Sequence, residues 1–266
     1  MTNYSHIKLS DTFYPQSAYP AALQAYYKGN ETSGSLIDTL GNFTLPIIGS
    51  GTVGGDGSAR GAFYAGAGGG ADNPTPSAFG LLDSTTSLAL LDTNLHTSFM
   101  YEVVLNVPTI PPVSHYPVVL RLPRGLYLAT AQWTSVTYSI SFNLSSNYIP
   151  TIPAAHNLAP GAAHYIVVAC LGTGTDELRV YIDKVLQYTG TFTQSANSLN
   201  CMAVGGAYDS ASPVHVASGL GDSTVREIAL HNGLASFANA EAIMALRMPT
   251  TVAALVSYPI VGMSGL

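Results

Sequence analysis

Residues 177–188, with the sequence ELRVYIDKVLQY, decide the fold that we expect for this chain. Apolar and polar side chains alternate up to the pair Asp183-Lys184, and an apolar run resumes directly after it. A period of two is typical of a strand with one buried face, and two residues between such runs form the shortest hairpin turn. The stretch therefore predicts a β-hairpin whose apolar face packs against a second sheet.

The same strand signal recurs along most of the chain. Short runs of Val, Ile, Tyr, Thr and Phe are separated by Gly, Pro, Asn and Asp, which predicts a sandwich or barrel of antiparallel strands. Only residues 21–27 and 238–247 have a helical pattern, and Ser236 or Asn239 is placed to cap the second one. The predicted strands are residues 99–107, 118–122, 126–130, 136–144, 164–171, 177–182, 185–188, 202–207 and 225–231.

The composition limits the kinds of partner that we expect. The chain has 266 residues, of which 47% are apolar but only 9% are charged, whereas about 25% is usual for charged residues in a soluble domain. Its surface must therefore be rich in neutral polar groups, which suits contact with other proteins or with sugars. Nucleic acid is not expected, because the net charge is −6 and the densest basic stretch holds only Arg121 and Arg124.

Both ends of the chain differ in composition from its middle. Residues 1–20 are rich in Tyr, Ser and Pro without a basic segment and an apolar core, so we expect an extended arm and no secretion signal. Residues 250–266 form an apolar tail that Pro259 and Gly262 interrupt, so we expect no membrane span there. Residues 21–249 are expected to form one β-sandwich domain between them.

Several segments follow one another in an order that is known from one family. They are residues 25–28 (AYYK), 34–42 (GSLIDTLGN), 98–103 (SFMYEV), 163–168 (AHYIVV), 178–186 (LRVYIDKVL), 202–206 (MAVGG) and 225–246. Together they resemble the laminin-G-like branch of the concanavalin A-like lectin/glucanase superfamily, which implies a jelly-roll sandwich of two curved antiparallel sheets. Two departures are Lys184, where the family usually has Gly, and Arg226, where its last strand often has Asp.

The residues that catalysis would need are not arranged in a known pattern, so we expect no enzyme activity. Glycoside hydrolysis needs two carboxylates across the scissile bond, and the glucanase branch carries them as Glu-x-Asp-x-x-Glu. No Glu of this chain begins that pattern, and there is no Gly-x-Ser-x-Gly. The five Glu are Glu31, Glu102, Glu177, Glu227 and Glu241.

Metal and thiol chemistry has equally few candidates, and we expect no cofactor. None of the seven His has a metal-ligand spacing to another. Cys170 and Cys201 stand in apolar runs and are either buried free thiols or partners in a disulfide. Calcium at the rim of the sandwich stays open, because an Asp in a loop can bind calcium or simply form a turn. The loop residues concerned are Asp72, Asp83, Asp92, Asp209 and Asp222.

Aromatic side chains are the candidates for sugar contact, because their faces suit the C–H surfaces of sugar rings. The chain has one Trp, which fits the core between the sheets as well as it fits the surface. Three Tyr lie in loop-like stretches beside Asp, Asn or Gly, where a structural role is the alternative. The candidate glycan-binding residues are Trp133, Tyr64, Tyr148 and Tyr208.

These features favour a non-enzymatic structural protein of a virion, as a capsid decoration or a component of a tail or fibre. The resemblance implies a bacteriophage, because sandwiches of this fold are common modules on phage capsids and fibres. The expected partners are other virion proteins and further copies of this chain, in a trimer. A module that recognises a cell-surface glycan and a glycoside hydrolase with an unrecognised site remain as alternatives.

Overall fold

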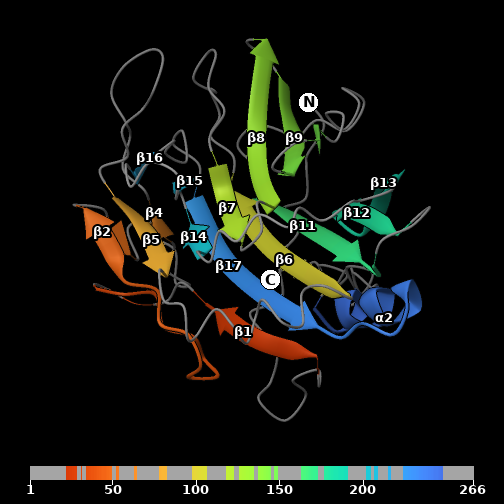
Figure 1. Cartoon of the computed structure of the whole chain (residues 1–266), viewed down its shortest axis with the longest axis horizontal. Helices are drawn as coiled ribbons and strands as arrows, with labels where there is room; N and C mark the ends of the chain where they lie inside the picture. The colour runs from red at the N-terminus through yellow and green to blue at the C-terminus, as the bar shows by residue number, and fades with distance from the viewer. Residues whose placement is uncertain are drawn as a thin grey trace, which may run out of the picture.

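The computed structural model places the described strands in two large antiparallel sheets, with a short helix beside them (Figure 1). The described residues are 22–28, 31, 34–49, 52–53, 63–64, 78–82, 98–106, 118–122, 126–134, 137–144, 147–148, 163–172, 177–190, 202–204, 207–208, 215–216 and 224–247. The expected arm at residues 1–20 and tail at residues 250–266 lie outside them. The prediction of an all-β antiparallel sandwich is confirmed.

The eight-stranded sheet has the order β13-β12-β11-β6-β17-β4-β3, and β1 pairs with β17 beside this path. Every pairing in it is antiparallel. Its strands are β1 (Leu23–Tyr27), β3 (Thr52–Val53), β4 (Phe63–Tyr64), β6 (Phe99–Asn106), β11 (Ala163–Cys170), β12 (Leu178–Ile182), β13 (Val185–Gly190) and β17 (Thr224–Asn232).

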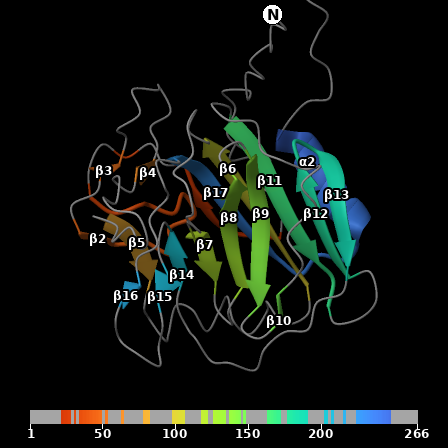
Figure 2. The same ribbon diagram turned by 90° about the horizontal axis from the view of Figure 1, so that it is seen from above.

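The seven-stranded sheet has the order β10-β9-β8-β7-β14-β5-β2 and forms the second layer of the sandwich (Figure 2). A separate ribbon consists of β15 and β16. The strands of the sheet and the ribbon are β2 (Ile47–Gly49), β5 (Ala78–Leu82), β7 (Val118–Leu122), β8 (Leu126–Thr134), β9 (Thr137–Leu144), β10 (Asn147–Tyr148), β14 (Met202–Val204), β15 (Ala207–Tyr208) and β16 (His215–Val216).

The predicted strands recur in the structure, most with ends shifted by one or two residues and two with larger changes. The strand predicted at residues 126–130 extends to Thr134, and the one predicted at residues 202–207 is divided into β14 and β15. Both changes follow from the neighbouring strands, which decide how far a ladder of hydrogen bonds continues.

The helix predicted at residues 21–27 was wrong, because this segment forms β1. Pairing with β17 supplies the backbone hydrogen bonds of this segment. A helix of only seven residues would be unstable, because its first turn costs more free energy than so few bonds return. The neighbours Tyr26 and Tyr27 are both buried, as expected for a strand that is covered on both faces. Residues 25–27, in the first segment of the laminin-G-like resemblance, thus lie in a strand.

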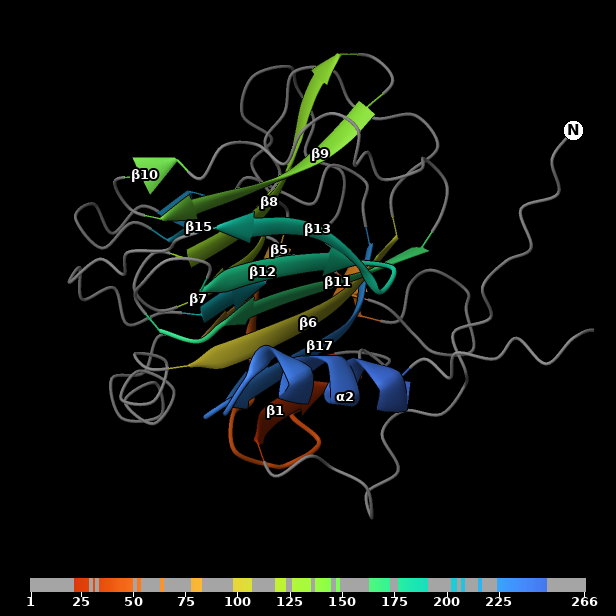
Figure 3. The same ribbon diagram turned by 90° about the vertical axis from the view of Figure 1, so that its right-hand side faces the viewer.

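Helix α2 (Phe237–Arg247) covers the face of the eight-stranded sheet that points away from the seven-stranded sheet (Figure 3). Its buried residues Ile243 and Met244 join one apolar cluster with side chains of β1, β6, β11 and β17. The hydroxyl of Ser236 accepts a hydrogen bond from the backbone N–H of Asn239 at 3.2 Å, so the predicted cap is confirmed.

The predicted hairpin of β12 and β13 is also confirmed. Its two turn residues, Asp183 and Lys184, have φ angles of 50° and 69°. Two successive positive φ angles define a type I′ turn, whose twist matches that of the strands and which favours Gly at the second position. Lys184 therefore occupies a backbone conformation that costs an ordinary L-residue about 1–2 kcal/mol.

The turn after β1 is organised around one carboxylate. Asp38, which is 2% exposed, accepts backbone N–H bonds from Tyr26 at 2.7 Å, Leu40 at 3.1 Å, Asn42 at 2.9 Å and Phe43 at 3.2 Å. Four charge-assisted bonds to one buried group hold the turn and the start of the sheet together. This is the segment that resembles the Asp-x-x-Gly-Asn turn of the laminin-G-like family.

Candidate functional site

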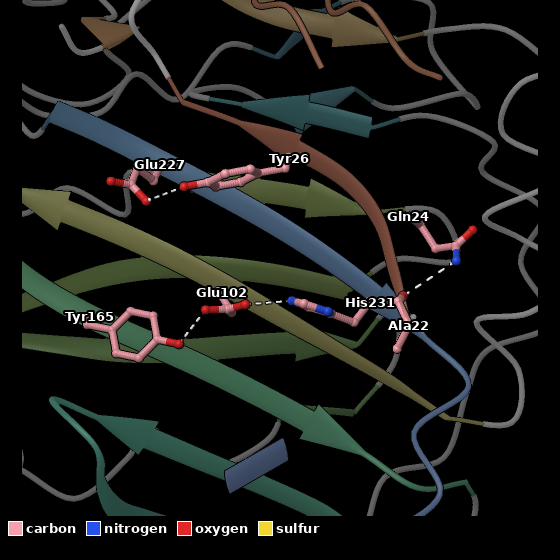
Figure 4. Close-up of polar contacts among 7 residues, drawn as sticks. All are labelled: Ala22, Gln24, Tyr26, Glu102, Tyr165, Glu227 and His231. Atoms are coloured by element: carbon pink, nitrogen blue, oxygen red, sulfur yellow. Dashed lines mark hydrogen bonds and ion pairs between the residues drawn. The ribbon is translucent and has the colours of Figure 1, made fainter. Parts of the chain in front are cut away.

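A buried polar cluster lies on the helix-covered face of the eight-stranded sheet (Figure 4). Glu102 of β6 lies at its centre, with its Oε1 atom 2.5 Å from Nε2 of His231 on β17. The hydroxyl of Tyr165 on β11 donates to the other carboxylate oxygen. Glu102 and His231 are 0% exposed and Tyr165 is 2% exposed. The cluster therefore joins the three central strands and has no surface at which a substrate could bind.

A second carboxylate on the same face has a similar role. The hydroxyl of Tyr26 on β1 donates to Oε2 of Glu227 on β17 at 3.1 Å, and both residues are buried. A buried carboxylate is tolerated where hydrogen bonds replace its hydration. Glu102 and Glu227, the two buried Glu of the described strands, thus belong to the scaffold of the eight-stranded sheet.

A second histidine–carboxylate pair fixes the hairpin turn. Nδ1 of His164 lies 2.8 Å from Oδ2 of Asp183, while Oδ1 of Asp183 accepts the backbone N–H of Tyr165 at 2.9 Å. The backbone N–H of Asp183 donates in turn to the carbonyl of Tyr165 at 2.8 Å. Three contacts from one residue dock the turn onto β11, which explains why Asp is used at the first turn position.

Only one of the two cysteines lies in the described part of the chain. Cys170 is a buried free thiol, and burial raises its pKa to about 11; Cys201 lies outside the described residues. Among the described residues, no group of three or more His, Cys, Asp and Glu could hold a metal ion. The loop residues considered for calcium are also outside the described part, namely Asp72, Asp83, Asp92, Asp209 and Asp222.

The four aromatic candidates for sugar contact are not brought together. Tyr64 lies in β4 of the eight-stranded sheet, Tyr208 in the separate β15–β16 ribbon, and Trp133 and Tyr148 in β8 and β10 of the seven-stranded sheet. The three Tyr were expected in loops, but each ends a two-residue strand, which is too short to leave a pattern in the sequence. The four residues therefore lie on four different strands, and their role in sugar contact stays a prediction.

Trp133 and Tyr148 lie near opposite ends of the β8–β9 hairpin. Tyr148 pairs with Asn143, which pairs with Tyr127 on β8. Trp133 is six residues further along β8 than Tyr127, which corresponds to about 20 Å of strand. It also falls at an irregularity of the ladder between Gln132 and Thr134, where alternation does not assign it to a face.

Backbone register instead places Tyr148 in a row of polar and aromatic residues. Arg121 of β7 pairs with Tyr127 of β8, Tyr127 with Asn143 of β9, and Asn143 with Tyr148 of β10. Residues that pair directly across a sheet share one face. With about 4.8 Å between strands, this β7–β10 row is about 14 Å long. Its far side continues to Ala203 of β14.

Alternation along the strands separates the two faces of the seven-stranded sheet. Next to the β7–β10 row, the same face of β8 and β9 has only small residues, namely Ala129, Ala131, Ser139 and Ser141. The other face has Leu120, Leu122, Leu126, Leu128, Ile140, Phe142 and Leu144, together with the polar Thr130, Gln132 and Asn147. Register thus places the β7–β10 row on the opposite face of the sheet from these residues.

Sequence reasoning missed Arg121, Tyr127 and Asn143 as candidates for a binding site. Each belongs to a predicted strand, and a polar residue in a strand carries no sign of which partner it faces. The pairings join positions as far apart as Arg121 and Tyr148, which only the register of four strands reveals. The alternation of Leu and polar residues in residues 118–130 could have indicated the face, but not the row.

The comparisons with known proteins identify the fold. No protein-family model matches the sequence, and no curated protein is similar to it. Domain 4 of AbnA, a GH43 extracellular arabinanase from Geobacillus stearothermophilus solved with arabinotriose, matches with a TM-score of 0.53 and 15% identity, over 85% of this chain and 98% of that one. At this identity the likeness shows a shared β-sandwich fold.

Two other solved structures match over a similar share of this chain. Botulinum neurotoxin type C, whose entrance into cells depends upon interaction with two ganglioside molecules, has a TM-score of 0.55 and 9% identity, over 85% of this chain and 51% of that one. Trypanosoma rangeli sialidase in complex with sialic acid has a TM-score of 0.52 and 12% identity, over 86% and 33%. The chain thus spans about half of the toxin structure and a third of the sialidase.

These likenesses show a β-sandwich fold, which agrees with the sandwich that the sequence resemblance implied, and they show no link to a bacteriophage. In the described part of the chain, no helix has the length and apolar character that crossing a membrane requires.

Proposed function

We propose that this chain is a non-catalytic module that recognises glycans through the outward face of its seven-stranded sheet. The observation that carries the proposal is the β7–β10 row, in which register sets two Tyr, one Asn and one Arg side by side on one face. Aromatic rings suit the apolar faces of sugars, and amide and guanidinium groups supply hydrogen bonds to hydroxyls.

The comparisons support the same class of ligand. The arabinanase domain was solved with arabinotriose, the sialidase with sialic acid, and the toxin interacts with gangliosides. A fold alone does not determine function, so the residues of the row must carry the binding.

A non-catalytic role is supported by where the described carboxylates lie. Glu102 and Glu227 are 0% and 5% exposed and are bonded to His231, Tyr165 and Tyr26. Neither is placed to flank a scissile glycosidic bond, as a pair of catalytic carboxylates must be. Release of reducing sugar by the purified protein, lost on substitution of an Asp or Glu, would contradict this part of the proposal.

A glycan array tests the proposal directly. The intact protein should bind a subset of glycans, and Tyr148→Ala should weaken that binding by about tenfold, since stacking of one ring is worth of the order of 1 kcal/mol or more. Tyr64→Ala is the matched control, because it removes the same ring from the other sheet. Absence of binding to every glycan would overturn the proposal, and equal loss in the two variants would move the site elsewhere.

A structural subunit of a virion is a second candidate function. Val185 and Leu186 are 58% and 45% exposed in β13, which ends the strand order of the eight-stranded sheet. Exposed apolar side chains on a terminal strand favour contact with another chain. Light scattering should then give a symmetric oligomer, expected to be a trimer, and deletion of residues 250–266 should leave a folded domain that no longer assembles. A monomer would contradict this candidate.

A further inference from the structure

The side chain of Asn232 is a buried amide whose hydrogen-bonding atoms are not used within the described part of the chain. Asn232 is the last residue of β17 and is 7% exposed. Its Nδ2 and Oδ1 atoms are both shielded from solvent, and no described residue forms a hydrogen bond to either of them. Its backbone N–H, by contrast, donates to the carbonyl of Ala22 at 2.8 Å. The side chain, and not the backbone, therefore needs a partner.

Register places Asn232 on the face of the eight-stranded sheet that points toward the seven-stranded sheet. Its neighbour His231 contacts Glu102 on the helix-covered face, and successive residues of a strand point to opposite faces. The residue that pairs with Asn232 on β6 is Phe99, and the next residue of β6, Met100, belongs to the cluster that helix α2 covers. Both strands thus place the Asn232 amide in the interior of the sandwich.

The described neighbours of Asn232 on this face are mainly apolar. Phe99 pairs with it on β6, and Leu230 lies two residues before it on β17. The ring of Tyr101 stacks on that of Phe99, with 4.5 Å between the ring centroids, and these three neighbours are all buried. An amide that is buried among such groups without a partner costs free energy, because it loses its hydrogen bonds to water. Buried amides in folded proteins are therefore bonded, either to protein or to ordered water.

The two polar atoms of the amide limit the kind of molecule that can satisfy them. Nδ2 donates hydrogen bonds and Oδ1 accepts them, so an anion would satisfy only the first and a cation only the second. A partner for both atoms must donate and accept, and it must fit into the closed interior of a sandwich. Water meets both conditions, and a buried water makes about three hydrogen bonds.

We infer that Asn232 binds an internal water molecule between the two sheets. The water supplies the hydrogen bonds that the amide lacks, and its remaining hydrogen bonds are available to polar groups across the sandwich. The site goes beyond the proposed glycan-binding function and does not depend on it, since it lies in the interior and not on the β7–β10 row.

Transfer of magnetisation from water to side-chain amide protons tests the inference in the full-length protein. Laboratory-frame and rotating-frame Overhauser spectra of the nitrogen-15-labelled chain should give cross-peaks between water and the Asn232 amide, with the sign relation of a long-lived water. Asn42 is the matched control in the same spectra, because its amide is exposed and donates to the carbonyl of Gln24 at 2.9 Å. It should show only the short-lived contacts of surface water. A crystal structure should place the water about 2.7–3.2 Å from Nδ2 or Oδ1.

Two variants identify the source of the signal. Tyr101→Phe removes a hydroxyl on the same face whose proton could exchange with water and mimic a bound water, so the cross-peaks should persist in this variant. Asn232→Leu has a similar size and no polar atom, so the water seen in the crystal structure should be lost. Circular dichroism and the thermal midpoint report folding of each variant.

The outcomes decide between water and a direct partner in the protein. Protein groups that bond to both Nδ2 and Oδ1 in the crystal structure, or an amide without any partner there, overturn the inference. Cross-peaks that disappear in a folded Tyr101→Phe variant overturn it as well. The measurements on the wild-type protein decide the question even if Asn232→Leu does not fold.

Discussion

The carboxylate of Glu102 lies 2.5 Å from Nε2 of His231, and neither residue is exposed to solvent. Because Glu102 also accepts the hydroxyl of Tyr165, its removal leaves two buried polar groups without this partner. We predict that Glu102→Ala lowers the free energy of unfolding by roughly 3–5 kcal/mol. Urea unfolding followed by circular dichroism measures the change, and a loss below about 1 kcal/mol would show that the cluster does not hold the strands together.

Lys184→Gly should stabilise the protein. Lys184 has a φ of 69°, and Gly adopts this conformation without the penalty of about 1–2 kcal/mol that an L-residue has there. The greater freedom of Gly in the unfolded chain costs about 0.5–1 kcal/mol in return. A net gain of up to about 1 kcal/mol is therefore expected in thermal or urea unfolding.

The neighbouring position provides the control. Asp183 has a φ of 50° but also contacts His164 and the backbone N–H of Tyr165. Asp183→Gly should therefore destabilise the protein, although it relieves the same kind of backbone conformation. Stabilisation by both substitutions would show that the contacts of Asp183 contribute little.

Asp38→Ala should be strongly destabilising. The side chain accepts four backbone N–H bonds within one turn, and bonds to a charged group contribute about 1.5–3 kcal/mol each before non-additivity. We expect a loss of about 3 kcal/mol or more in urea unfolding. Asn42→Ala is the control, since it removes one exposed bond to Gln24, and it should cost about 1 kcal/mol or less. Similar losses for the two variants would contradict the central role of Asp38.

Stability should fall at alkaline pH. Burial raises the pKa of Cys170 from 9.0 to about 11, and it also raises the pKa values of Tyr27 and Tyr101 above their ordinary value of 10.0. As the pH rises, these groups lose their protons in the unfolded chain before they do so in the folded protein. Their contribution to the free energy of unfolding is therefore fully present below pH 9 and is lost as the pH rises through their folded-state pKa values. For Cys170 the slope reaches about 1.4 kcal/mol per pH unit between pH 9 and 11.

Cys170→Ala isolates the thiol. Between pH 9 and 10 the buried Tyr hydroxyls contribute equally in both proteins, so the variant, which lacks the thiol, should lose stability with a smaller slope than the wild type does. Urea midpoints at several pH values measure both slopes, and equal slopes would contradict a raised thiol pKa.

The elements with strong local patterns could be predicted from the sequence. The hairpin around Asp183-Lys184 and the cap at Ser236 depend on a few adjacent residues, and the structure has both. The helix predicted at residues 21–27 was wrong because the local pattern of so short a segment does not specify its structure. Pairing with β17 makes it a five-residue strand.

The candidate site was harder to predict than the fold. Trp133 and Tyr148 are candidates for sugar contact because they are aromatic. Their residue type does not reveal that Trp133 lies about 20 Å along β8 from the β7–β10 row. Arg121 was noted only as one of two basic residues in a stretch. Its place in the row follows from the register, because only the assembled sheet shows that it pairs with Tyr127.

The most direct test of the central claim is a map of the glycan site by NMR. Backbone amide shifts of the isotope-labelled protein are followed during titration with the oligosaccharide that binds best on the array. Our account predicts that the largest shifts fall in β7, β8, β9 and β10, around Arg121, Tyr127, Asn143 and Tyr148. Shifts confined to the eight-stranded sheet or to helix α2, or no shifts at saturating glycan, would contradict it.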